Sequence, residues 1–133
     1  MLAAVFLGGC VGGVARYGAV ATWPGAPRAF PWSTLAVNLV GALVLAVVVV
    51  IAAEVRPRRY LRPLLGTGFC GALTTFSSVV VAVAQLLGEG RAAVAVSYLA
   101  ANIVGGLATA ALGLVAARGL AENRRRANEN RSR

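Results

Sequence analysis

Residues 66–78 have the sequence GTGFCGALTTFSS and lie inside a long apolar segment that covers about residues 64–87. In this stretch, three glycines are followed by four hydroxyl residues at positions 74, 75, 77 and 78. A helix of about twenty residues crosses the roughly 30 Å hydrocarbon core of a bilayer. Because glycine weakens a helix and hydroxyl groups can satisfy the freed backbone, the stretch predicts a membrane helix that is broken near the midplane.

Close helix packing is the alternative explanation for these glycines. Small residues let two membrane helices approach each other, and the first apolar segment carries two such pairs, Gly8 with Gly12 and Gly9 with Gly13. In a broken helix, freed carbonyls suit a cation such as Na⁺, whereas freed N–H and hydroxyl donors suit an anion. Both explanations stay open at the level of the sequence.

Three further apolar segments cover about residues 2–22, 32–53 and 92–117. The composition agrees with them, since 59% of the 133 residues are hydrophobic and only 13% are charged. Short connections make neighbouring helices antiparallel. We therefore expect an all-α membrane protein in which residues 1–117 form a four-helix transmembrane channel domain and residues 118–133 form a basic cytoplasmic tail.

The thirteen basic residues, all arginines, are distributed unevenly along the chain. Four lie in the middle loop and six in the tail, which makes ten on the side that the two termini share. The opposite side holds only Arg28 and Arg91. The positive-inside rule therefore places both termini in the cytoplasm, in a multi-pass protein of the cell membrane. The same rule accounts for the net charge of +9 without a nucleic-acid partner.

Few side chains could carry chemistry. The chain has no histidine, its two cysteines lie in apolar segments, and no nucleophile–base pair or metal cluster is evident, so we do not expect an enzyme. Arg16 is the one ionisable group inside a predicted span. It could extend to the membrane surface beside Tyr17 and Trp23, or it could line a water-filled vestibule that attracts an anion.

Two polar stripes share helix faces by their spacing. Thr34 and Asn38 are four positions apart, and the last span carries a second series at intervals of three and four: Tyr98, Asn102, Gly106 and Thr109. Hydrogen bonds between helices would explain any one of these residues. Together with Arg16 and spans that contain no acid, they are also typical of an anion path.

At these positions the chain resembles the Fluc/CrcB family of fluoride channels. The resemblance runs from about Leu7 to Gly113 and rests on one motif in each of the first three spans, with Tyr98 and Gly106 in the fourth. The motifs are Gly9-x-x-Gly12-Gly13-x-x-Arg16-Tyr17, Trp32-x-Thr34-Leu35-x-Val37-Asn38-x-x-Gly41 and Gly68-Phe69-x-Gly71-x-x-Thr74-Thr75-Phe76-Ser77. Each motif alone is moderately specific, and their common order is highly specific.

The resemblance implies an antiparallel dimer with two pores that passively exports fluoride from the cytoplasm. It implies a structural Na⁺, which is not transported, on the backbone carbonyls of Gly71 and Thr74. Arg16 would lie at a vestibule, and the Phe76 ring would present its positive edge to fluoride. The implied fluoride path consists of Asn38, Thr75, Phe76, Ser77, Tyr98 and Asn102.

Three positions depart from the family pattern: Val79 replaces a second phenylalanine, Ala82 an acidic residue, and Asn102 a small hydroxyl residue. A strong charge bias also opposes insertion in both orientations. We therefore expect this subunit to pair with a related subunit of opposite orientation. One alternative is a small multidrug-type transporter, which would need an acidic residue within the membrane. The other is a helical membrane subunit without transport activity.

Overall fold

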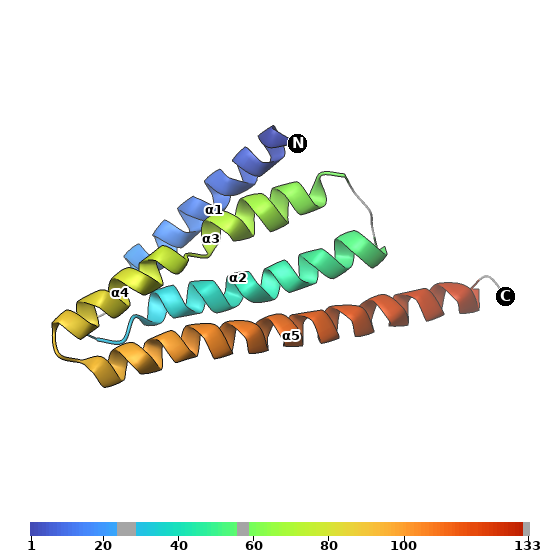
Figure 1. The fold of residues 1–133 in the computed structure, drawn as a ribbon. Coiled ribbons are helices and arrows are strands. Elements are labelled where there is room, and N and C mark those ends of the chain that lie inside the picture. The colour runs from blue at the N-terminus through green and yellow to red at the C-terminus, as the bar shows by residue number, and fades with distance from the viewer. Residues whose placement is uncertain (24–28, 56–58, 132–133) are drawn as a thin grey trace.

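The computed structural model describes residues 1–23, 29–55 and 59–131, and in these ranges it contains helices and no strand. Figure 1 shows the helices as an elongated bundle in which consecutive long segments run in opposite directions. In chain order the elements are α1 (Leu2–Thr22), α2 (Trp32–Val50), η1 (Ile51–Val55), η2 (Arg62–Cys70), α3 (Gly71–Leu73), α4 (Phe76–Gly88) and α5 (Ala92–Arg131). The two η elements are π-helical.

Four helical segments are long and apolar enough to cross a membrane: Leu2–Thr22, Trp32–Ala53, Arg62–Gly88 and Ala92–Arg131. This confirms the all-helical, four-span class that the sequence predicted. The last segment is α5, whose 40 residues correspond to a helix of about 60 Å. It therefore continues well beyond a single bilayer crossing, into the part of the chain predicted to be a cytoplasmic tail.

The first span packs against the third through glycine. A Cβ atom at Gly8 would overlap the backbone carbonyl of Leu64, and one at Gly12 would overlap the carbonyl of Phe69. Gly9 and Gly13 face open space instead. Only one of the two glycine pairs therefore lets α1 approach η2, and small-residue packing is a real function of these glycines.

The second half of the bundle is formed by α2 and α4, both of which pack on α5 (Figure 1). One buried cluster there consists of Leu35, Val79 and Tyr98, with partly buried apolar side chains around them. Much of the remaining apolar surface is exposed in the isolated chain; Leu2, for example, is 87% exposed. Such a surface suits lipid or a second subunit rather than water.

The third span is interrupted between α3 and α4. Thr74 (φ −78°, ψ 153°) and Thr75 (φ −149°, ψ 116°) are both extended, so the helical hydrogen-bond pattern stops and restarts there. A Cβ atom at Gly41 of α2 would overlap the Thr74 side chain, which shows how closely α2 approaches this point. The position of the interruption at the middle of the bilayer stays a prediction.

Candidate functional site at the helix interruption

The side chain of Asn38 pairs with the backbone of the extended residue Thr75. Its Oδ1 accepts the Thr75 N–H at 2.9 Å, and its Nδ2 donates to the Thr75 carbonyl at 3.2 Å. These two backbone groups would otherwise be part of a continuous helix. Because an unsatisfied buried backbone group is costly, this amide stabilises the interruption.

Asn102 extends the same network. Asn38 Nδ2 also donates to Asn102 Oδ1 at 3.0 Å, and Asn102 Nδ2 donates to the Tyr98 carbonyl at 2.9 Å. The backbone fixes both amide orientations, because the Thr75 N–H requires an oxygen and the Tyr98 carbonyl requires an N–H. Both hydrogens of the Asn38 amide are thereby used, whereas one hydrogen of Asn102 is left for another acceptor.

The carbonyls at the end of α3, including those of Gly71 and Thr74, lose their usual helical donors at the interruption. In a continuous helix the N–H groups of Thr75 and Ser78 would donate to the carbonyls of Gly71 and Thr74. Here the Thr75 N–H donates to Asn38, and the Ser78 N–H donates to Thr75 Oγ1 at 3.2 Å, which caps α4. The carbonyls of Gly71 and Thr74 are thus among those that the interruption releases, and oxygen ligands of this kind suit a hard cation.

A hollow of about 400 Å³ with a mixed polar and apolar lining lies beside the interruption. Arg16 is half-buried there and, in the described part of the chain, forms no ion pair. No acidic side chain lines the hollow, so the guanidinium charge is not neutralised locally. The lining residues are Gly13, Arg16, Tyr17, Val20, Thr34, Val37, Thr75 and Ser78.

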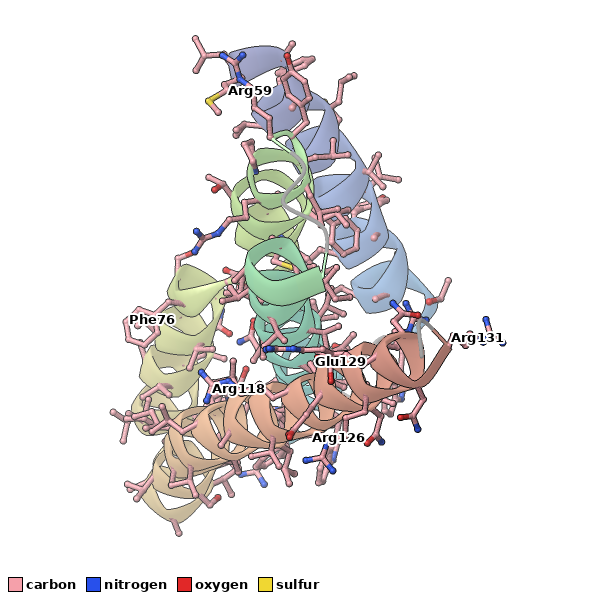
Figure 2. The ribbon with its side chains drawn as sticks, turned by 90° about the vertical axis from the view of Figure 1, so that its right-hand side faces the viewer. Arg59, Phe76, Arg118, Arg126, Glu129 and Arg131 are labelled. Atoms are coloured by element: carbon pink, nitrogen blue, oxygen red, sulfur yellow. The ribbon has the colours of Figure 1, made fainter. Side chains whose placement is uncertain are left out.

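An open groove of about 410 Å³ also borders the interruption. Thr75 lines both this groove and the Arg16 hollow. Phe76 is 71% exposed, and Figure 2 shows its ring pointing away from the neighbouring helices. The groove is lined by Asn38, Thr74, Thr75, Phe76, Val79, Asn102, Ile103, Gly106 and Leu107.

Ser77 and Tyr98 are not among the residues that line this groove. Ser77 is exposed, and its Oγ lies 3.2 Å from Thr75 Oγ1, so the two hydroxyls share a hydrogen bond. Tyr98 is fully buried, and among the described residues its hydroxyl has no hydrogen-bond partner, although Thr34 and Asn102 lie close to it. The hydroxyl of Tyr98 is therefore a buried donor that remains to be satisfied.

An aromatic contact that the sequence did not indicate holds Tyr98 in place. The Phe30 ring, just before α2, meets the Tyr98 ring edge-on at 5.2 Å and 89°. No local motif marks Phe30, since the contact depends on how α2 and α5 pack. Val79, where the resemblance predicts a second phenylalanine, is 1% exposed and belongs to the same core.

The structure thus brings Asn38, Thr75, Phe76 and Asn102 together on one groove and places Arg16 in the adjoining hollow. The lining residues offer amide, hydroxyl and guanidinium donors and include no carboxylate. Such a set suits an anion and does not suit a proton relay or a transported organic cation. Fold and site together define a polytopic helical membrane protein with an anion-compatible polar path.

Comparison with known proteins agrees with this class. Residues 3–114 match the family model described as CrcB-like protein, Camphor Resistance (CrcB). The match covers most of the chain, and the chain belongs to the CrcB-like family. That family is a class of ion channels rather than of enzymes.

Several relatives carry the name fluoride-specific ion channel. The chain is 43% identical over 119 residues to FluC 1 of Streptomyces coelicolor, covering 89% of this chain and 77% of that one. It is 40% identical to FluC of Gloeobacter violaceus, covering 87% and 94%. It is also 43% identical over 104 residues to FluC 2 of Streptomyces avermitilis, covering 77% of this chain and 66% of the relative, just under two thirds of its length.

Proposed function

We propose that this chain is a subunit of a fluoride-specific channel that passively exports fluoride from the cytoplasm. The observation that carries the proposal is the donor-lined interruption at Thr75, which Asn38 stabilises and which no carboxylate lines. Membership of the CrcB-like family and the names of the relatives support fluoride as the permeant ion.

Fluoride is small and tightly hydrated, so a pore must replace its water with closely set donors. The donors nearest to the interruption are the second amide hydrogen of Asn102 and the hydroxyls of Thr75, Ser77 and Ser78. Thr75 donates to Ser78 at 3.0 Å and also contacts Ser77, so a hydroxyl would have to turn from this cluster to reach fluoride. The edge of the Phe76 ring carries the positive part of the aromatic quadrupole and adds a weak attraction. Asn38 acts differently, because its hydrogens are already used: it positions Thr75.

Arg16 would attract the anion to the path. Its unpaired charge lies in a hollow that Thr75 also lines, so an anion drawn to Arg16 is brought next to the interruption. A charge in a concave, partly apolar site raises the local concentration of counter-ions. We therefore favour the vestibule explanation of Arg16 over simple extension to the membrane surface.

The released carbonyls of Gly71 and Thr74 fit a structural Na⁺. When bound, the ion would supply positive charge that holds two interruptions together between antiparallel subunits. Gly71 is exposed, and a Cβ atom added to it would meet open space; Phe76, five positions later, is also exposed, so this part of the third span is free to meet a partner. Two such subunits would form two pores.

The charge distribution supports a fixed orientation with both termini in the cytoplasm, in a multi-pass protein of the cell membrane. A chain that inserts in one orientation cannot supply both halves of an antiparallel dimer. We therefore propose that it pairs with a related subunit of opposite orientation. Val79 supports this pairing, because this subunit lacks the second phenylalanine of the family pattern.

Fluoride efflux from liposomes tests the channel function. The purified chain would be reconstituted with and without its partner, and efflux would be followed with a fluoride electrode while valinomycin carries the compensating K⁺. We expect fluoride to leave rapidly and chloride to stay. Proton-coupled efflux of organic cations would favour the multidrug-type transporter, and a complete lack of flux would favour a non-transport subunit.

Cysteine labelling tests the pairing. In a Cys10→Ala, Cys70→Ala background, a single Ser132→Cys substitution marks the C-terminus for a membrane-impermeant reagent applied to intact cells. A fixed orientation predicts labelling only after the cells are opened. Equal labelling from both sides, together with fluoride flux from the chain alone, would show that the chain is a self-sufficient dual-topology dimer.

A further inference from the structure

A further groove lies away from the helix interruption, lined by residues from the end of α2, η1 and the later part of α5. Figure 1 shows these parts of the chain at the end of the bundle nearer the C-terminus. The volume of the groove is about 470 Å³, larger than either hollow beside the interruption. Six of its seven lining residues are apolar, and the seventh is Arg124. The lining consists of Val47, Ile51, Ala116, Ala117, Leu120, Ala121 and Arg124.

Arg124, the one charged residue of the groove, differs in its ion pairing from the two arginines that follow it. Arg125 pairs with Glu129 at 3.3 Å and Arg126 pairs with Glu122 at 2.5 Å, both within α5. In the described part of the chain, Arg124 forms no ion pair. The groove therefore ends at a positive charge that is free for an outside anion, and Figure 2 shows the charged side chains of this part of α5 extending around the helix.

The groove lies near the end of the second apolar span. Leu120 is one helical turn before Arg124, or about 6 Å along α5. The apolar span that contains α2 ends at Ala53, close to Ile51 of the groove. The apolar part of the groove therefore lies beside the end of the second apolar span, and Arg124 lies one turn further along α5, where a phospholipid headgroup would be within its reach.

We propose that this groove binds one anionic phospholipid, with an acyl chain along its apolar part and the phosphate on Arg124. Basic pockets between membrane helices on the cytoplasmic side are suited to anionic headgroups. The charge of Arg124 selects an anionic lipid over a zwitterionic one, and the apolar lining selects a lipid over a soluble phosphate. The inference requires a membrane protein and does not depend on fluoride transport.

Native mass spectrometry of the detergent-purified full chain tests the proposal. The probes are phosphatidylglycerol and phosphatidylcholine with identical acyl chains. We expect phosphatidylglycerol to be retained preferentially, and Arg124→Gln to lower its binding by about fivefold, the effect expected for one arginine near an anionic lipid. Arg131→Gln, the matched control on the same helix outside the groove, should leave binding unchanged.

A second variant tests the apolar part of the groove. Ala116 is exposed, so Ala116→Phe should fill the groove without disturbing the core, and it should lower binding of both lipids. Equal effects of Arg124→Gln and Arg131→Gln would overturn the proposal, because they would show attraction to the helix as a whole. Cross-linking of Ala116→Cys to a second copy would overturn it too, by showing that protein covers the groove.

Discussion

Asn38 and Thr75 are 37 positions apart in the sequence, yet the side-chain amide of one satisfies both backbone groups of the other, at 2.9 and 3.2 Å. The same amide donates to Asn102, so three of the four spans meet at one polar cluster. The consequence is that a break in the third helix is held open by the second. We expect this link to control both stability and conduction.

Asn38→Leu should destabilise the protein and abolish fluoride flux. Leucine is similar in size to asparagine but cannot form hydrogen bonds. The N–H and carbonyl of Thr75 would lose their partners, at a cost of about 1–3 kcal/mol for each buried group. The free energy of unfolding can be measured by denaturant titration in detergent. Asn123→Leu, in the exposed part of α5, is the matched control and should change stability little. Similar small losses for both variants would show that the Asn38 link does not hold the break.

Asn102→Leu should lower fluoride flux by about tenfold or more. It removes an amide of the groove lining that has one hydrogen to spare, together with the acceptor for Asn38. A hydrogen bond to a charged group contributes about 1.5–3 kcal/mol. Ile103→Leu changes an exposed apolar residue of the same groove and should leave flux unchanged. Normal flux through Asn102→Leu would remove Asn102 from the path.

Arg16→Gln should slow fluoride entry most strongly at low ionic strength. A charge that steers an anion is screened by salt, over a Debye length of about 10 Å at 0.1 M. The difference between Arg16→Gln and wild type should therefore shrink as inert salt is added, while Arg16→Lys keeps most of the flux. A defect that is independent of salt, or a loss of stability alone, would support a structural role at the membrane surface.

Gly12→Ala should destabilise the bundle, whereas Gly13→Ala should not. The added methyl group at Gly12 overlaps the Phe69 carbonyl, and forced overpacking typically costs about 1–3 kcal/mol. At Gly13 the methyl group meets open space, and replacing glycine by alanine in a helix contributes up to about 1 kcal/mol. Denaturant titration of the two variants should show shifts of opposite sign. Equal shifts would mean that α1 does not contact η2 through Gly12.

The sequence predicted the four spans because hydrophobic length alone determines which segments can cross a bilayer. It could not decide between the two glycine pairs of the first span, since both fit the same motif. Only the rotation of α1 against η2 selects Gly8 and Gly12. A local pattern therefore identifies a packing surface without saying which side of the helix is used.

The site was predictable as a set of residue types and not as an arrangement. Polar spacing indicated Asn38 and Asn102, but the pairing of Asn38 with the Thr75 backbone depends on the relative height of two helices, which no local pattern encodes. Phe30 carried no signal, because its contact with Tyr98 arises from packing. The sequence indicates that Val79 departs from the family pattern, and the structure adds that it is a core residue with 1% exposure.

The most direct test of the central claim is the reversal potential of the current that the purified chain, with its partner, carries across a planar bilayer. The measurement would use a fluoride gradient, with equal chloride concentrations on both sides. The account predicts a current that reverses at the equilibrium potential of fluoride and follows it when the gradient is changed. A reversal at zero potential, or no current from the assembled pair, would contradict the assignment of a fluoride-specific channel.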